Sequence, residues 1–214
     1  MIYRDRADAG RQLAASIRER VALSDDEVPL VLGVPRGGVP VAAEVADALG
    51  GELDVLVAHK LGAPGNPELA IGAVAEDGTL VLDEPVIAAL RIPAQYLEDE
   101  RKRQLADVEE RARRFRGRRA APSARDRTVI VVDDGIATGA TLQAALRLLR
   151  VSGARRVIAA APVGARESVR RVSGDADLVV CPLQPRAFRA VGSWYRQFDQ
   201  VPDAEVVRLL GGGR

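Results

Sequence analysis

Five short apolar runs, separated by helical patterns, constrain the fold of this chain most strongly. The runs are PLVLGV (29–34), LDVLVA (53–58), TVIVV (128–132), RRVIAAAPV (155–163) and ADLVVCP (176–182). Hydrophobicity is continuous in TVIVV and in VIAAA, which is typical of strands covered on both faces. Strands that alternate with helices form parallel sheets through right-handed crossovers. We therefore expect an α/β fold with an open parallel β-sheet and helices on both faces.

Helical patterns fill most intervals between these runs. Leu13, Ile17 and Val21 lie four residues apart, which predicts one apolar helix face. Helices are expected over 8–21, 41–50, 94–118 and 166–172. The helix over 94–118 is long and highly charged, and it ends in a basic run.

The remaining segments lack a strong periodic pattern. HKLGAPGNPELAIG (59–72) is rich in Gly and Pro and predicts a loop. Short strands are expected near 71–75 and 79–82. The residues that follow 182 are expected to be irregular or edge structure.

Composition and charge narrow the class of protein. The 31 basic and 30 acidic residues give a net charge of +1, which offers no global attraction to nucleic acids or anionic membranes. Cys181 is the only cysteine, so no internal disulfide can form. The opening residues are charged throughout, and no apolar run has the length of a membrane span. We expect a cytoplasmic, single-domain protein over 1–214.

The stretch VIVVDDGIATGAT (129–141) carries the clearest functional signal. A buried strand delivers Asp133 and Asp134, the acidic pair, to the edge of the sheet where ligands bind in α/β folds. A loop of small and hydroxyl residues then opens a helix, whose free N–H groups suit a phosphate. This phosphate loop consists of Ala137, Thr138, Gly139, Ala140 and Thr141. Carboxylates repel a phosphate but accept from hydroxyls, so a ribose 5-phosphate satisfies both halves.

Other interpretations of this stretch explain less. The chain contains no GxxxxGK[ST] motif and no GxGxxG after a strand, which disfavours P-loop and dinucleotide-binding folds. A plain helix-capping turn explains Thr138 or Thr141. It does not explain two adjacent aspartates at the end of an apolar strand.

VIVVDDGIATGAT resembles the phosphoribosyl pyrophosphate (PRPP) motif of type I phosphoribosyltransferases. The resemblance implies that Asp133 and Asp134 hold the ribose 2- and 3-hydroxyls and that 137–141 surround the 5-phosphate. It also implies PRPP as donor, a nitrogen nucleophile such as a nucleobase as acceptor, and Mg²⁺ as cofactor. The acidic pair would then contact the metal indirectly, through water or ligand oxygens.

GVPRGGVPVAAEVADAL (33–49) supplies a second strand–loop–helix motif. In the family, the matching loop binds pyrophosphate, a role that fits Arg36, Gly37 and Gly38. The alternative is a strand-to-helix turn with a surface arginine. Lys60 would bring a cation to the leaving pyrophosphate from a mobile loop and is a catalytic candidate together with the acidic pair.

Two neighbours of Lys60 carry less information. His59, the only histidine, more often acts as a structural hydrogen bonder at such a position. Glu68 either lines the same loop or faces solvent.

The aromatic segment FRAVGSWYRQF (188–198) resembles the base-covering hood of purine-type members, and we place the hood at 184–200. Phe188, Trp194 and Tyr195 are the candidates for stacking on a base. Core packing is the alternative for these rings and the expectation for Phe198.

Several features depart from the family pattern. Ala137 replaces the acidic residue that serves the base in 6-oxopurine members, and AAPVGAR (160–166) lacks their lysine. Hypoxanthine and guanine are therefore disfavoured, and the acceptor stays open. The stretch 76–127 is longer than usual and is expected to be a helical insertion, a flap or a homodimer contact.

Two rival functions stay open. One is a regulator that binds PRPP or a nucleotide without turnover. The other is a nucleic-acid binder that uses the basic run RARRFRGRR (111–119), although such runs are most often solvated helix ends. Balanced net charge makes a nucleic-acid partner the weaker of the two.

Overall fold

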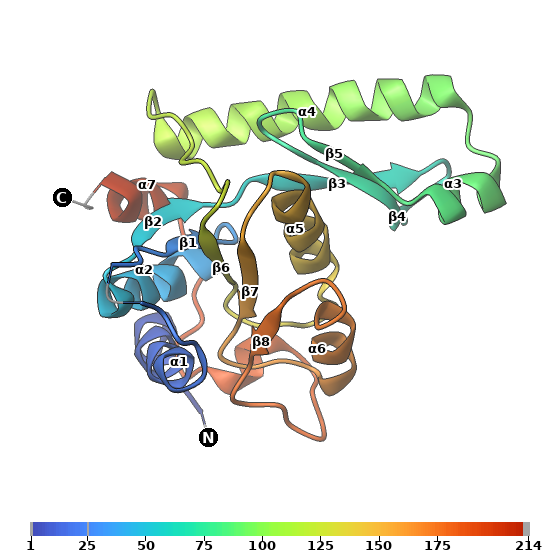
Figure 1. The fold of residues 1–214 in the computed structure, drawn as a ribbon. Coiled ribbons are helices and arrows are strands. Elements are labelled where there is room, and N and C mark those ends of the chain that lie inside the picture. The colour runs from blue at the N-terminus through green and yellow to red at the C-terminus, as the bar shows by residue number, and fades with distance from the viewer. Residues whose placement is uncertain (1, 25, 212–214) are drawn as a thin grey trace.

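A parallel sheet forms the centre of the computed structural model, which describes residues 2–24 and 26–211 (Figure 1). Within these residues the sheet has five strands in the order β2-β1-β6-β7-β8. They are β1 (Leu30–Gly33), β2 (Glu52–Val55), β6 (Thr128–Val132), β7 (Arg156–Ala160) and β8 (Leu178–Val180). Helices pack on both of its faces, which confirms the predicted α/β class.

Alternate residues of each central strand enter different cores. Val129 and Val131 of β6 pack with α5 (Ala140–Val151) and α6 (Arg166–Val172). Ile130 and Val132 pack on the opposite face, with α1 (Arg6–Arg20) and α2 (Gly38–Leu49). Both faces of the strand are therefore buried, which explains why its sequence is apolar without alternation.

A second, antiparallel sheet lies beside the first. It contains β3 (Ala58–Ala63), β4 (Asn66–Ala75) and β5 (Leu80–Leu82). The chain continues through α3 (Glu84–Leu90) into α4 (Ala94–Arg116), which lies along this sheet in Figure 1. β3 and β4 contact α4 and also α5 of the core.

The predicted loop over 59–72 is therefore wrong. Its Gly and Pro residues are concentrated at the hairpin turn, where Gly65 has a positive φ of 73°. On either side of that turn, Leu61 and Ile71 are fully buried against α3 and α4. Turn composition conceals the two strands because each apolar stretch is short.

The C-terminal part contains more helix than predicted. A 3₁₀ turn spans Val191–Trp194, and α7 covers Asp203–Gly211. Val206 and Leu210 of α7 are buried with Phe115 of α4. Among the described helices, none has both the length and the apolar character required to cross a bilayer.

A buried ion cluster joins α4 to the parallel sheet. Nε of Arg116 lies 2.6 Å from Oδ2 of Asp54, and Nη2 donates to the carbonyl of Val55 at 2.6 Å. Glu76 accepts from Nη1 of the same guanidinium. Because the side chains of Arg116 and Asp54 are only 5% and 2% exposed, neither charge has bulk water to replace its partner.

We predict that Arg116→Leu lowers the free energy of unfolding by about 3–5 kcal/mol, since the buried Asp54 then keeps only the half-exposed Arg119, 3.6 Å from its Oδ1, as an ionic partner. Urea denaturation measures the change. Arg101→Leu on the same helix removes a surface pair with Glu98 and is expected to cost less than about 1 kcal/mol. Equal losses in the two variants would contradict this account of the cluster.

Candidate functional site

The acidic pair lies directly beyond β6, at the carboxyl edge of the parallel sheet. The backbone N–H of Asp133 donates to the carbonyl of Ala160 at 3.1 Å. This bond lies one residue past the last paired position of β6 and β7. The N–H of Asp134 donates to Oδ1 of Asp133 at 2.8 Å. These bonds hold both carboxyl groups at the point where the chain leaves the strand.

The PRGG loop (35–38) lies against this pair. β1 and β6 are parallel neighbours with Gly33 opposite Val132, so their following loops emerge side by side. A Cβ atom on Gly37 would stand 2.0 Å from Oδ2 of Asp134, and one on Gly38 would stand 2.5 Å from the Val132 carbonyl. The two glycines are therefore required for this contact. The peptide bond between Pro35 and Arg36 is cis.

The phosphate loop connects the acidic pair to α5. Gly139 has a positive φ of 78° and serves as the N-cap of α5. The first N–H groups of a helix lack intrahelical backbone partners, so this end of α5 is suited to an acceptor group. A cavity of about 110 Å³ lies at this helix end. It is lined by Asp133, Gly135, Ile136, Ala137, Thr138, Gly139, Ala140, Thr141 and Leu142.

Helix α6 supports the phosphate loop. The buried Ser168 hydroxyl donates to the carbonyl of Ala137 at 2.6 Å. Arg171 donates to the carbonyl of Thr138 at 3.2 Å and to the Ser168 hydroxyl at 2.8 Å. Donors from α6 thus satisfy two carbonyls of the loop, and the N–H of Ala140 donates to the Thr138 hydroxyl at 3.5 Å.

Burial and proximity change the acidity of the pair. Burial, and then the charge of Asp134, raise the pKa of Asp133 from 3.8 to about 8. Burial also raises the pKa of Asp134, whereas the hydrogen bond and charge of Arg6 oppose that rise. Nε of Arg6 lies 2.9 Å from Oδ2 of Asp134.

Arg36 of the PRGG loop forms part of a second ion cluster. Its Nη1 lies 3.3 Å from Oδ1 of Asp203, in the first turn of α7. Nη1 of Arg114 lies 3.3 Å from Oδ2 of the same carboxylate. Two guanidinium groups thus converge on one acidic group beside the loop.

Lys60 lies within β3, in the antiparallel sheet, because the segment is a strand rather than the expected loop. Nδ1 of His59 lies 3.0 Å from Oε1 of Gln104, and Nε2 lies 3.3 Å from Nη1 of Arg111. These contacts bind β3 to α4, which agrees with a structural role for His59. The side chain of Glu68 lies outside the part that the structure describes.

The hood packs against the N-terminus and the acidic pair. The ring of Tyr195 is buried, and its hydroxyl donates to the carbonyl of Asp134 at 2.6 Å. Tyr195 therefore supports the site, and its ring is not presented to a ligand as the stacking hypothesis required. Phe188 and Trp194 are half-buried. Phe198, expected in the core, is 36% exposed.

These contacts bring the acidic pair, the phosphate loop and the PRGG loop to one edge of the sheet. A family model described as the phosphoribosyl transferase domain matches residues 1–192. The chain belongs to this family. The resemblance inferred from VIVVDDGIATGAT is thereby confirmed.

Relatives of this phosphoribosyl transferase domain differ in length. Two proteins of Mycobacterium tuberculosis, from strains CDC 1551 and H37Rv, are provisionally named phosphoribosyl transferases and are 47% identical over 209 residues. The match covers 98% of this chain and 46% of each relative, so the chain spans about half their length. The crystal structure of TT1426 from Thermus thermophilus is 47% identical, covers 98% of both chains and has a TM-score of 0.88.

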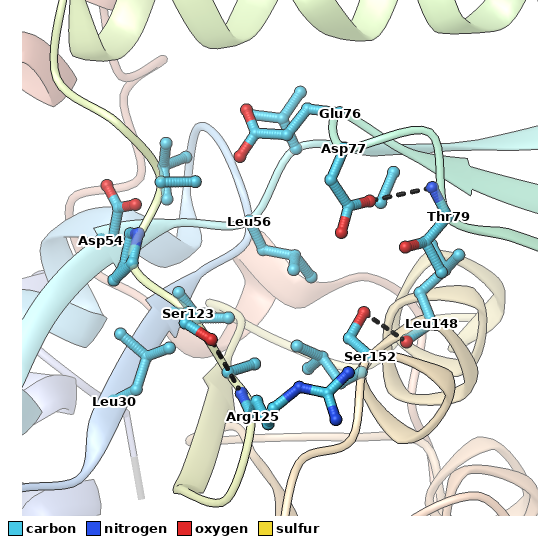
Figure 2. A pocket seen from close by; sticks show the side chains of 18 of the residues that line it. Leu30, Asp54, Leu56, Glu76, Asp77, Thr79, Ser123, Arg125, Leu148 and Ser152 are labelled. Atoms are coloured by element: carbon cyan, nitrogen blue, oxygen red, sulfur yellow. Dashed lines mark hydrogen bonds between the residues drawn. The ribbon is translucent and has the colours of Figure 1, made fainter.

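A larger cavity of the phosphoribosyl transferase domain, of about 420 Å³, lies away from these motifs (Figure 2). Leu148 and Ser152, at the end of α5 opposite the phosphate loop, line it. Arg125 lies beside Ser152, and Glu76 and Asp77 line the other side. The large hollow and the polar groups at the carboxyl edge of the sheet are therefore separate features.

Sequence patterns did not identify Arg6, Asp203, Ser168 or Arg171 as parts of the site. Arg6 and Asp203 are 128 and 167 residues from the partners they contact. Of these four residues, only Ser168 and Arg171 are related by a pattern visible in the sequence, since their spacing of three places them on one face of α6.

The pKa of Asp133 predicts a pH-dependent stability. Between about pH 4 and about pH 8 the folded state keeps a proton that the unfolded chain has lost, so this group makes stability fall as pH rises. Asp133→Asn removes the effect. We compare the free energy of unfolding of the variant with that of wild type. From pH 5 to pH 8 this difference is expected to shift in favour of the variant by more than about 1.4 kcal/mol, the equivalent of one pKa unit.

Urea denaturation at both pH values measures this gain. Asp107→Asn, an exposed change on α4, is the matched control. Stability curves of wild type and Asp133→Asn that run parallel over this range would contradict the prediction.

Proposed function

We propose that this chain is a phosphoribosyltransferase that uses PRPP as donor and displaces pyrophosphate with a nitrogen nucleophile such as a nucleobase. The observation that carries the proposal is the contact between Gly37 and the Asp134 carboxylate. It brings a loop suited to pyrophosphate against the groups suited to ribose. One ligand that carries both a ribose and a pyrophosphate fits this adjacency.

In this proposal the ribose phosphate end of the donor binds along the end of β6. Asp133 and Asp134 accept from the 2- and 3-hydroxyls. The phosphate loop, 137–141, surrounds the 5-phosphate with the N–H groups of α5. Thr138 and Thr141 add hydroxyl donors.

The pyrophosphate end binds the PRGG loop. Gly37 and Gly38 let the backbone approach, and Arg36 presents a guanidinium that suits phosphate oxygens. Lys60 supplies a further cation from β3, which packs against α5. These cations favour the charge that develops on the leaving group.

The acidic pair also fits an indirect role with Mg²⁺. Within residues 2–24 and 26–211, no three His, Cys, Asp or Glu side chains gather to hold a metal by themselves. Carboxyl oxygens are hard donors, and Mg²⁺ readily takes its other ligands from phosphates and water. When bound, Mg²⁺ would neutralise charge on the departing pyrophosphate.

The proposed reaction breaks the bond between carbon 1 of the ribose and the pyrophosphate oxygen. A bond forms between carbon 1 and the acceptor nitrogen, which loses its proton, and the electron pair of the broken bond leaves with pyrophosphate. The transition state has oxocarbenium character, as in glycosyl transfer generally. The chain contributes by positioning the sugar, stabilising the leaving group and excluding water.

The acceptor is expected to differ from hypoxanthine and guanine. Ala137 cannot exchange a proton with a base, and 160–166 offers no lysine to an exocyclic oxygen. Phe188 and Trp194 are the hood rings left as stacking candidates. Rapid turnover of either oxopurine would contradict this part of the proposal.

A PRPP-binding regulator without turnover is the alternative. Two ion pairs support this alternative, because they join proposed ligand-binding residues to other residues of the same chain. They are Arg6 with Asp134 and Arg36 with Asp203. A regulator would bind PRPP and release no pyrophosphate. The same measurements distinguish the two functions.

The proposed function is tested by pyrophosphate release from PRPP with Mg²⁺ and a panel of nucleobases. We expect release with at least one base, and a loss of roughly tenfold or more in Asp134→Asn, since a charge-assisted hydrogen bond is removed. Calorimetric binding of PRPP without release for any base would favour the regulator. Absence of both binding and release would overturn the proposal.

Arg36 and Asp203 predict opposite effects on pyrophosphate binding. Arg36→Ala is expected to weaken calorimetric affinity for pyrophosphate roughly tenfold and affinity for ribose 5-phosphate much less. Asp203→Asn removes a carboxylate that competes for Arg36 and Arg114. It is expected to strengthen pyrophosphate binding about two- to fivefold, as an exposed pair allows.

Glu110→Gln is the control for the second variant, because it removes one ion pair of Arg114 and leaves Asp203 in contact with both arginines. Equal losses of both ligands in Arg36→Ala would contradict the division between the subsites. Weaker pyrophosphate binding in Asp203→Asn would contradict the competition.

A further inference from the structure

Arg6 is a cation that reaches the acidic pair from the first turn of α1. Its Nε lies 2.9 Å from Oδ2 of Asp134, across 128 positions of sequence. The two side chains are only 13% and 15% exposed. The pair therefore differs from the surface ion pairs of α1, since little solvent competes with it.

The hood fixes the position of the Arg6 guanidinium. Nη1 donates to the carbonyl of Asp199 at 2.7 Å. The guanidinium carbon lies 4.0 Å from the centroid of the Phe198 ring. One edge of the group thus meets the hood backbone, one face meets an aromatic ring, and Nε meets the carboxylate.

The N-terminus is itself held to the hood by backbone hydrogen bonds. The N–H of Tyr3 donates to Trp194 at 2.8 Å, and the N–H of Arg196 donates to Tyr3 at 2.9 Å. Next to these bonds, Tyr195 donates to the carbonyl of Asp134. The hood therefore holds Asp134 twice, through its carbonyl and, by way of Arg6, through its carboxylate.

This arrangement answers two demands of a ribose site. Adjacent acidic groups repel each other, and the nearby Arg6 cation offsets this repulsion. With Oδ2 engaged by Arg6, Oδ1 is the oxygen left to accept from a hydroxyl. A fixed carboxylate of this kind needs less ordering when the sugar binds.

We propose that Arg6 is a positioning residue for ribose binding, which holds the Asp134 carboxylate in one orientation and connects it to the hood. The inference rests on the proposed function, because ribose hydroxyls are the groups that Asp134 would bind. It adds a residue that lies outside the strand–loop motifs.

The test compares calorimetric affinities for ribose 5-phosphate and for inorganic phosphate. Arg6→Gln is expected to weaken ribose 5-phosphate binding roughly tenfold, as the loss of a charge-assisted bond implies, and to change phosphate binding by less than about twofold. Arg6→Lys restores the charge and is expected to recover most of the affinity. Arg11→Gln, on the same helix and paired with Glu44 at 3.1 Å, is the control and leaves both affinities unchanged.

Phe198→Leu provides a second variant that keeps the ion pair but removes the aromatic face. It is expected to show the same selective loss at about two- to fivefold, in line with a cation–π contact. This variant tests the inference even where Arg6→Gln does not fold.

Three other outcomes would contradict the role of Arg6, and the first would also contradict the proposed function. Absence of ribose 5-phosphate binding by the wild-type chain would overturn the proposed function and this inference with it. Wild-type binding with unchanged or tighter binding by Arg6→Gln and Phe198→Leu would overturn the inference alone. Equal loss of both ligands would mean that Arg6 supports the fold in general, and would also overturn it.

Discussion

The parallel pairing of β1 with β6 sets the geometry on which the site depends. Gly33 lies opposite Val132, so the PRGG loop and the acidic pair leave adjacent strands at the same level. A shift of one residue in this register would turn each strand's buried side chains to the opposite face. The two apolar cores that cover the sheet therefore hold the glycine loop and the carboxylates in contact.

Charge in this region is balanced mainly by groups distant in sequence. Arg6 reaches Asp134, and Asp203 reaches Arg36 from α7. Each of these partners occupies a group to which the proposal assigns a ligand. The free chain thus keeps its functional charges paired, which limits the energetic cost of gathering them at a buried sheet edge.

The sequence predicted the central sheet and the acidic pair because both leave local patterns, namely continuous apolar runs and a compact strand–loop–helix motif. It did not predict β3 or the first half of β4, since the Gly and Pro residues of their turn dominate a short segment. It missed α7, whose apolar face is defined by packing on α4. Arg6 and Asp203 were missed for a different reason, because their contacts exist only once distant elements meet.

The bonds of His59 to Gln104 and Arg111 have a mechanical consequence for Lys60, its neighbour on β3. These contacts join the start of β3 to α4, so Lys60 belongs to a packed strand and not to a pliable loop. The position of its backbone therefore depends on the packing of β3 against α4 and α5.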